Sequence, residues 1–298
     1  MGCFLLDTDF CGDCDDVAAL ALLCGAAADH PGDVRLAGVA VNVGCPPTAT
    51  AVRAVLDFYG LGGTPVGIAE TPDPHGCASR YLDALAALSA EKSPASVTAR
   101  ALYRKLLSEA DDGSLSVVSI GYFNNLDAAL HDDPELFHRK VRAVYLMAGG
   151  FGPRQNHLEC NVMGHLECTR RFVRDYRGQA IYVGFECGVS IQTDLTGFPA
   201  GTDHFLLRAF ELRSDDHMRH PSWDPITVDL ALNGENDCYR LSNPGLVEID
   251  DEGHTLFSEN PLGNARHLIF TASDADVSAR ITREVRKAAR LGQGQNEQ

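Results

Sequence analysis

Short apolar runs alternate with longer stretches of helical periodicity along this 298-residue chain. Because such alternation is typical of repeated βα units, it predicts an α/β fold whose mostly parallel central sheet is flanked by helices. The predicted strands span residues 3–7, 34–41, 65–69, 115–120, 143–147 and 180–183. The predicted helices span residues 15–29, 48–59, 96–110, 125–131, 165–174 and 274–291.

Nothing in the chain is typical of an interdomain linker. No tract rich in Pro, Ser or Gly interrupts a sequence of which 45% is hydrophobic, so we expect one domain over residues 1–298. Two long stretches, 71–93 and 193–225, do not fit the βα pattern. We expect them to form loops or small helices, with 193–225 as a lid or insertion near the site.

Charge and apolar patterning narrow the possible partners. The chain has 41 acidic and 25 basic residues, a formal net charge of −16, which disfavours nucleic acids and anionic membranes and favours a small neutral or cationic substrate. No basic leader or long apolar segment is present, so we expect a soluble, cytoplasmic protein. The ten cysteines are expected to be mostly buried thiols, and Cys11 and Cys14 lack a second pair at zinc spacing.

Polar residues follow most of the predicted strands at their carboxyl ends. In open α/β sheets these ends meet at one edge, where ligands bind, so we expect these residues to form one site. The polar residues lie at 7–16 after the first strand, Asn42 after the second, 121–125 after the fourth, 149–161 after the fifth and Glu186 after the sixth.

The stretch 7–16 contains five aspartates. Carboxylates packed at close range cannot all ionise unless a positive charge lies among them, and a hard divalent cation would supply it. Oxygen ligands suit Ca²⁺, or Mg²⁺ with more retained water. The alternative is an acidic helix cap formed by Asp15 and Asp16, which leaves the other three carboxylates unexplained.

This acidic loop also resembles a known motif. Asp7-Thr8-Asp9, then Gly12, then Asp15-Asp16 resemble the Asp-x-Asp-Pro-Gly-x-Asp-Asp of inosine-uridine-type nucleoside hydrolases. Here the loop is two residues longer, Phe10-Cys11 replaces Pro-Gly, and Asp13 is an additional acid, as in a remoter branch of that family.

Further motifs of that family follow in order, and the resemblance spans residue 4 to about residue 230. Trp223 stands where many members have a His directly before a metal-binding Asp. The other matching positions are Asn42, His75-Gly76, the stretch SIGYFNNL at 119–126, LMAGGF at 146–151, Glu159-Cys160-Asn161 and SWDP at 222–225.

The resemblance implies a Ca²⁺-dependent hydrolase that cleaves a ribonucleoside into ribose and free base. It implies that Asp9 ligates the ion and takes the proton of the attacking water. Asp16, Asp224 and the backbone carbonyl of Asn124 would complete the ligand set, and Asp15 would bind ribose hydroxyls. It further implies a role in purine or pyrimidine salvage and a homo-oligomer, dimer or tetramer.

Three more residues are candidate substrate contacts. Glu159 and Asn161 stand two apart on what we expect to be an extended segment, so both could grip the 5′ side of the sugar. Asn42 is a candidate contact too, although an Asn at a strand end equally often forms an Asx turn.

The residue that protonates the leaving base is the open point. Trp223 cannot donate an ionisable proton, but it can stack on a base, unless it is simply a core residue. His75 is the favoured acid because of its His-Gly context. Which nucleobase is cleaved, an ordinary or a modified one, therefore stays open. The further acid candidates are Tyr81, Glu186, His217, Arg219 and His220.

Two other functions compete with hydrolysis. A nucleoside- or sugar-binding protein could have kept the metal site and lost the acid. The stretch FLLDTDF at 4–10 also resembles the start of haloacid-dehalogenase phosphatases, but Cys11 stands where they have Thr or Val, and no later Lys and paired-Asp motif follows.

Overall fold

A computed structural model describes residues 2–70, 79, 81–90, 95–199, 204–213 and 218–291. Its main sheet has the strand order β12-β11-β13-β7-β6-β5-β1-β2-β3-β4, and all neighbours from β13 to β4 pair in parallel. These parallel strands are β1 (Gly2–Thr8), β2 (Val34–Val41), β3 (Val66–Ile68), β4 (Val97–Thr98), β5 (Leu115–Ser119), β6 (Val141–Met147), β7 (Ala180–Val183) and β13 (Ala265–Phe270).

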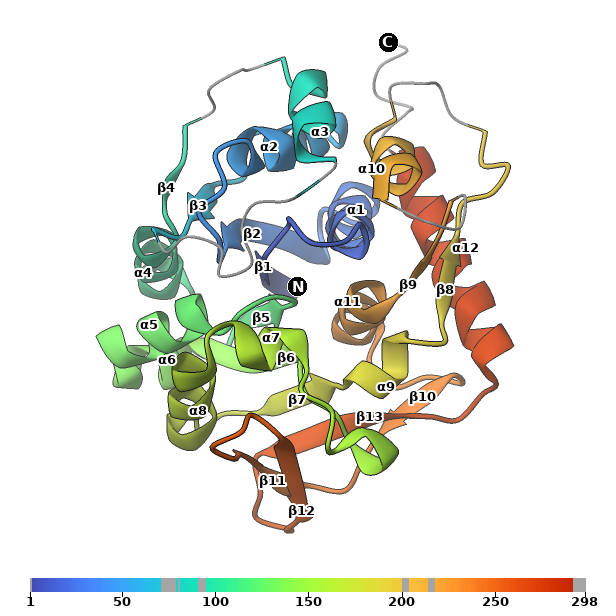
Figure 1. The fold of residues 1–298 in the computed structure, drawn as a ribbon. Coiled ribbons are helices and arrows are strands. Elements are labelled where there is room, and N and C mark those ends of the chain that lie inside the picture. The colour runs from blue at the N-terminus through green and yellow to red at the C-terminus, as the bar shows by residue number, and fades with distance from the viewer. Residues whose placement is uncertain are drawn as a thin grey trace.

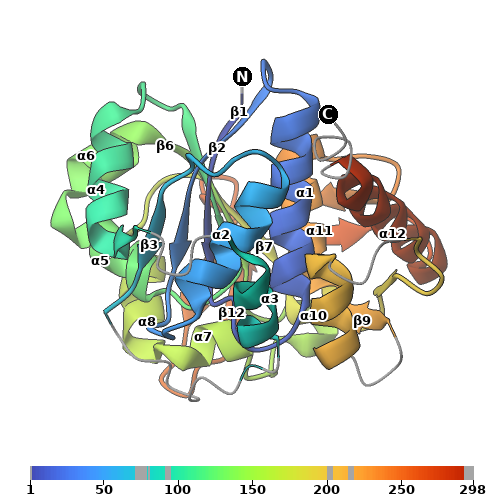
Figure 2. The same cartoon turned by 90° about the horizontal axis from the view of Figure 1, so that it is seen from above.

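Helices cover both faces of the sheet (Figures 1 and 2). On one face lie α1 (Asp15–Asp29), α2 (Thr48–Phe58), α3 (Leu82–Leu88), α10 (Phe205–Arg213), α11 (Trp223–Asn233) and α12 (Asp274–Leu291). On the other lie α4 (Ala99–Glu109), α5 (Asn124–Asp132), α6 (Pro134–Lys140) and α8 (Leu166–Asp175). Two hydrophobic cores fill the two interfaces. The mostly parallel α/β fold predicted from the sequence is therefore confirmed.

The order of the strands determines where a ligand can bind. β1 leads outward to β2, β3 and β4 on one side, while β5, β6 and β7 continue on the other. The gap between the carboxyl ends of β1 and β5 is therefore a topological switch point, the usual binding crevice of an open α/β sheet. The acidic loop begins there.

Helix α1 runs from this crevice through the centre of one layer. Its residues from Val17 to Cys24 are almost wholly buried, against α11 and α12. A Cβ added at Gly25 would lie 2.8 Å from the Cβ of Ala288, so the close approach of α1 and α12 requires glycine there. This packing fixes the first turn of α1, and with it Asp15 and Asp16.

Several predicted boundaries match the structure, notably 15–29, 34–41, 180–183 and 274–291. The helix predicted for 96–110 is shorter, because residues 97–98 form β4 and the Thr98 hydroxyl caps the helix by accepting the Ala101 amide at 3.1 Å. The described part of the stretch 193–225 contains the small helix α10 and most of the β8–β9 pair (Gln192–Asp194 and Arg219–Pro221). A role of this stretch as a lid stays a prediction.

The sequence analysis missed the end of the sheet formed by the C-terminal third of the chain. There β10 (Tyr239–Leu241) and β11 (Gly245–Ile249) pair antiparallel with β13, and β12 (Thr255–Glu259) pairs antiparallel with β11. These strands are short and largely exposed, so their apolar runs are interrupted. Among the helices of the described ranges, none is long and apolar enough to cross a lipid bilayer.

Candidate functional site

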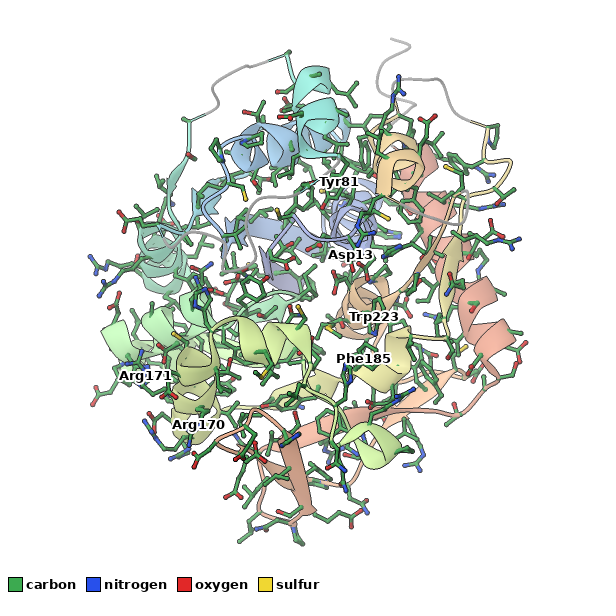
Figure 3. The ribbon with its side chains drawn as sticks, in the orientation of Figure 1. Asp13, Tyr81, Arg170, Arg171, Phe185 and Trp223 are labelled. Atoms are coloured by element: carbon green, nitrogen blue, oxygen red, sulfur yellow. The ribbon has the colours of Figure 1, made fainter. Side chains whose placement is uncertain are left out.

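A cavity of about 600 Å³ opens at the carboxyl edge of the sheet. Its walls come from the loop between β1 and α1, the segment after β6, the start of α11, the short helix α9 (Phe185–Gly188) and the end of α10. In Figure 3, Asp13, Trp223 and Phe185 lie in a row across the centre of the molecule. The residue groups that the sequence placed at one edge thus largely meet in one cavity.

Four carboxylates form the polar end of this cavity. Asp13, Asp15, Asp16 and Asp224 each offer an oxygen atom within 4.8 Å of the others. Three come from the acidic loop and the first turn of α1, and Asp224 comes from the first turn of α11. Asp9 lines the same cavity. The four aspartates predicted to bind the metal or the ribose therefore all line this cavity: Asp9, Asp15, Asp16 and Asp224.

The electrostatics of this cluster favour a cation. Burial, followed by the neighbouring carboxylates, raises the pKa of Asp15 and of Asp224 well above its usual value. Burial also raises the pKa of Asp16 to about 7. One buried oxygen, Oδ1 of Asp15, has no hydrogen-bond partner among the described residues. An oxygen-only donor set with an unsatisfied carboxylate fits a hard divalent ion such as Ca²⁺.

The conformation of the loop explains why it departs from the Pro-Gly of the related motif. Phe10 has a φ of 42°, in the left-handed region, which the ring of a proline cannot adopt. The Phe10 ring is fully buried and meets Tyr81 edge-on at 6.2 Å. Its amide donates to Thr8 Oγ1 at 3.1 Å and to Asp16 Oδ1 at 3.2 Å. The longer loop is therefore built around a buried aromatic anchor.

Asp13, the additional acid of this loop, has a different environment from its neighbours. His220 Nε2 lies 3.6 Å from Asp13 Oδ2, and Arg213 Nε donates to the carbonyl of Gly12 at 2.8 Å. Burial would raise the pKa of Asp13, but its contacts with His220 and Asp15 and the charge of Arg213 hold it at about 2. Asp13 is therefore ionised at neutral pH and ties the acidic loop to α10 and β9.

Glu159 and Asn161 both line the cavity, but not as the sequence predicted. The expected extended segment is wrong, because residues 160–164 form helix α7 (Cys160–Gly164) with Glu159 as its N-cap. The Glu159 carboxylate accepts the amides of Asn161, Val162 and Gly149 at 2.8, 3.0 and 3.1 Å. Burial raises its pKa to about 7 in spite of these bonds. Capping, rather than strand alternation, brings the two side chains to one cavity.

Three rings form an aromatic wall of the cavity. Phe185 stacks against Trp223 with ring centres 5.5 Å apart, and His157 packs on Phe185 at 3.8 Å. The indole Nε1 of Trp223 donates to the backbone carbonyl of Phe185 at 2.8 Å, which fixes the indole plane. Burial and the charge of Arg154 lower the pKa of His157, so this ring is neutral at pH 7. All three residues line the cavity.

Two predicted residues lie behind the cavity rather than in it. Asn42 Nδ2 donates to Asp7 Oδ1 at 2.9 Å, and Asn124 Nδ2 donates to the Asn42 carbonyl at 2.9 Å. Neither is among the described residues that line the cavity. Direct substrate contact by Asn42 and metal ligation by Asn124 stay predictions.

The candidate acids are scattered. His75 and His217 lie outside the described residues. Glu186 accepts the Phe151 amide at 3.0 Å, and Arg219 pairs with Asp194 at 2.9 Å. Tyr81 and His220 are buried beside the acidic loop.

Tyr122, His157, Phe185 and Arg213 line the cavity and were not among the predicted site residues. Tyr122 stands inside the quoted stretch 119–126 and His157 inside the polar stretch 149–161, so their positions could have marked them. Phe185 and Arg213 stand in no quoted stretch and reach the cavity only through the fold.

Comparison with known proteins places this geometry in a family. The model of the family described as inosine-uridine preferring nucleoside hydrolase matches residues 4–276. A search of curated protein sequences gave no match.

Solved structures share the fold over nearly the whole chain. An inosine-uridine preferring nucleoside hydrolase from Bacillus anthracis superposes with a TM-score of 0.71 at 16% identity, covering 97% of this chain and 99% of its own. A purine-preferring ribonucleoside hydrolase from Gardnerella vaginalis gives 0.70 at 16% identity, covering 97% and 99%. The type III effector protein XopQ, solved with adenosine diphosphate ribose, gives 0.74 at 16% identity, covering 97% and 94%.

Proposed function

Because this chain belongs to the inosine-uridine preferring nucleoside hydrolase family, we propose that its cavity binds a ribonucleoside and hydrolyses the N-glycosidic bond with the help of Ca²⁺. The observation that carries the proposal is the cluster of Asp13, Asp15, Asp16 and Asp224, whose oxygen atoms lie within 4.8 Å of one another in a cavity large enough for a nucleoside. Such a cluster cannot be fully ionised without a cation.

The acidic end supplies the hydrolytic half of the reaction. Asp9, Asp16, Asp224 and the Asn124 carbonyl would hold the ion. A bound Ca²⁺ would lower the pKa of a water molecule. Asp9, the least buried of these three aspartates, would take a proton from the attacking water.

The middle of the cavity supplies the ribose contacts. Asp15 Oδ1 is a buried acceptor without a hydrogen-bond partner among the described residues, and a ribose hydroxyl can donate to it. Glu159 lines the cavity with a carboxylate that can also accept a hydroxyl on the 5′ side of the sugar. Asn161 also lines the cavity, and Asn42, a further proposed substrate contact, lies behind the acidic loop and donates to Asp7.

The aromatic wall supplies the base contact. Trp223 and Phe185 form a flat apolar surface on which a nucleobase can stack. His75 is the proposed acid for the departing base, and a modified base that leaves without strong protonation fits the loss of the late His equally well. We extend the proposal to a cytoplasmic homo-oligomer, dimer or tetramer, that acts in purine or pyrimidine salvage.

A non-catalytic nucleoside- or sugar-binding protein is the second candidate function. Trp223 favours it, because the position that carries an ionisable His in many members of the family holds an indole here. The relative XopQ was solved with adenosine diphosphate ribose, which makes a larger ribose-containing ligand part of this second proposal.

One experiment separates the two functions. The purified protein is stripped of metal with a chelator, reloaded with Ca²⁺ and incubated with purine and pyrimidine ribonucleosides, and free base and reducing sugar are measured by chromatography. Release of both that depends on Ca²⁺ supports hydrolysis. Ca²⁺-dependent thermal stabilisation by a nucleoside or by adenosine diphosphate ribose, without any release, supports binding alone.

A further inference from the structure

A further buried carboxylate, Asp7, lies directly behind the acidic loop and has no part in the reaction proposed above. It is fully buried near the end of β1 and is not among the described residues that line the cavity. Its side chain accepts three hydrogen bonds from three different elements. Tyr103 Oη of α4 donates at 2.5 Å, Asn42 Nδ2 after β2 at 2.9 Å and Asn125 Nδ2 of α5 at 3.2 Å.

These bonds hold the start of helix α5. Asn125 reaches Asp7 directly, and the residue before it, Asn124, donates its Nδ2 to the backbone carbonyl of Asn42 at 2.9 Å. Asn42 in turn donates its own side-chain amide to Asp7. The first two residues of α5 are therefore tied to the end of β2, Asn125 through the Asp7 carboxylate and Asn124 through the Asn42 carbonyl.

The same carboxylate lies one residue before the threonine that holds the acidic loop. Side chains alternate along a strand, so Asp7 faces the α4 side while Thr8 faces the loop, where its hydroxyl donates to Asp16. Two backbone hydrogen bonds also join the end of β1 to the segments after β5 and β2. The Ile120 amide donates to the Asp7 carbonyl at 2.8 Å, and the Asn42 amide donates to the Thr8 carbonyl at 2.9 Å. Asp7 thus joins β2, α4 and α5 at the root of the loop.

The network has no spare room. A Cβ added at Gly121 would lie 2.5 Å from Asn42 Nδ2 and 2.5 Å from the Asp9 amide nitrogen. Three donors also require an acceptor-only group at position 7, because an amide there would turn its own N–H groups toward another donor. Both the charge state and the size of the group at this position are therefore constrained.

We infer that Asp7 is a positioning residue of the candidate site, which fixes the start of α5, and with it the Asn124 carbonyl, relative to the acidic loop. This inference rests on the proposed function. Partners behind a metal ligand orient it, and their loss typically lowers metal affinity or activity about ten- to a hundredfold.

The test is Asp7→Asn, which keeps the size and changes the acceptor. We expect the Ca²⁺ Kd by calorimetry to rise, and kcat at saturating Ca²⁺ to fall, each by about ten- to a hundredfold. A purely structural role for Asp7 predicts instead a lower Tm with wild-type Ca²⁺ Kd and kcat.

Asp229→Asn is the matched control. Asp229 is also a buried carboxylate, but its partner is Arg280 of α12, with Nε at 2.8 Å. This variant is expected to unfold at lower temperature with wild-type Ca²⁺ Kd and kcat. If Asp7→Asn does not fold, Asn125→Ala removes the tie to α5 while keeping the carboxylate, and its Ca²⁺ Kd is expected to rise at least about threefold.

The outcomes distinguish a failure of the positioning role of Asp7 from a failure of the proposed function. Wild-type Ca²⁺ Kd and kcat in folded Asp7→Asn, or a wild-type Kd in Asn125→Ala, overturn the positioning role and leave the proposed function standing. A wild-type protein that neither binds Ca²⁺ nor releases base overturns both.

Discussion

The backbone amide of Asp224 donates a hydrogen bond to Oδ2 of Asp15 at 3.2 Å, across 209 residues of sequence. It joins the first turn of α11 to the first turn of α1, two helices that pack side by side in the same layer (Figure 1). The amino ends of both helices therefore point their dipoles at one group of carboxylates, which favours the ionised acids but does not balance all of them. The remaining charge is what a cation would neutralise.

Stability without metal is expected to fall as pH rises. The pKa values of Asp16 and Glu159 are raised to about 7 by burial, so between about pH 4 and 7 the folded protein keeps protons that the unfolded chain has lost. Each such group then lowers the free energy of unfolding by about 1.4 kcal/mol per pH unit. The opposite effect of Asp13, whose pKa is about 2, is confined to pH below about 4.

Thermal unfolding in a chelator at pH 5, 6, 7 and 8 measures this dependence. We expect Tm to decrease over the series and Ca²⁺ to restore it at pH 8. Calorimetry in buffers of different ionisation enthalpy should detect protons released on Ca²⁺ binding near pH 6. A Tm that rises from pH 5 to pH 8 in the chelator would contradict the carboxylate assignment.

Asp224→Asn is expected to have opposite effects with and without metal. Its carboxyl has a strongly raised pKa from burial and from Asp15, so removing its charge relieves repulsion in the metal-free protein. At pH 8 in a chelator, we expect the variant to unfold a few degrees above wild type, at roughly 2 to 4 °C per kcal/mol. With saturating Ca²⁺ wild type should be the more stable. Equal Ca²⁺ affinity in both proteins would remove Asp224 from the ligand set.

Asp9→Asn tests the proposed base. Asp9 is less buried than Asp15 or Asp16, and we expect its variant to keep the fold and wild-type Tm within a few degrees. Losing a general base should lower kcat by about 10²- to 10⁴-fold. Circular dichroism verifies the fold and chromatography of released base gives kcat. Turnover that matches wild type would assign the water's proton to another group.

The sequence predicts an element well where a long apolar pattern is bounded by polar residues. Helix α1 is such a case, because Asp15 and Asp29 bracket an almost wholly buried stretch. Helix α7 has only five residues and little periodicity, so the Glu159 cap that forms it could not be told from an extended segment.

In the candidate site, too, local features could be predicted and long-range contacts could not. The aspartates of the acidic loop are local in sequence, and their grouping could be predicted. The contact between Asp13 and His220 could not, because it depends on how β9 packs against a loop 207 residues earlier. Asp7 stands in the same quoted stretch, yet the alternation of β1 turns its side chain away from the cavity. The sequence therefore predicted which aspartates lie near the site, but not which way each side chain points.

Glu159→Gln separates capping from ribose binding. A glutamine has one acceptor oxygen for three backbone amides, so one amide is left unpaired and we expect a loss of about 1 to 2 kcal/mol in the free energy of unfolding. If Glu159 also binds the 5′ side of the sugar, KM for a ribonucleoside rises about tenfold, whereas a 5′-deoxynucleoside is affected less.

The control for that variant is Asp133→Ala, which removes the cap of α6, where Asp133 Oδ1 accepts the Leu136 amide at 2.9 Å. It should lower stability without changing KM. Equal KM values for wild type and Glu159→Gln would leave Glu159 as a structural cap only.

Trp223 is the residue whose substitution bears most directly on substrate identity. Its indole stacks on Phe185 and is fixed by the bond from Nε1 to the Phe185 carbonyl. Trp223→Ala removes the stacking surface, worth about 0.5 to 1.5 kcal/mol for an aromatic pair, so KM for a purine nucleoside should rise about three- to tenfold. Trp223→Phe keeps a ring and loses the hydrogen bond, so its KM should lie between the two. The inhibition constant of ribose alone, measured in the same assays, should stay within twofold in both variants. A parallel loss for ribose and for nucleosides would mean that Trp223 shapes the pocket and does not contact the base.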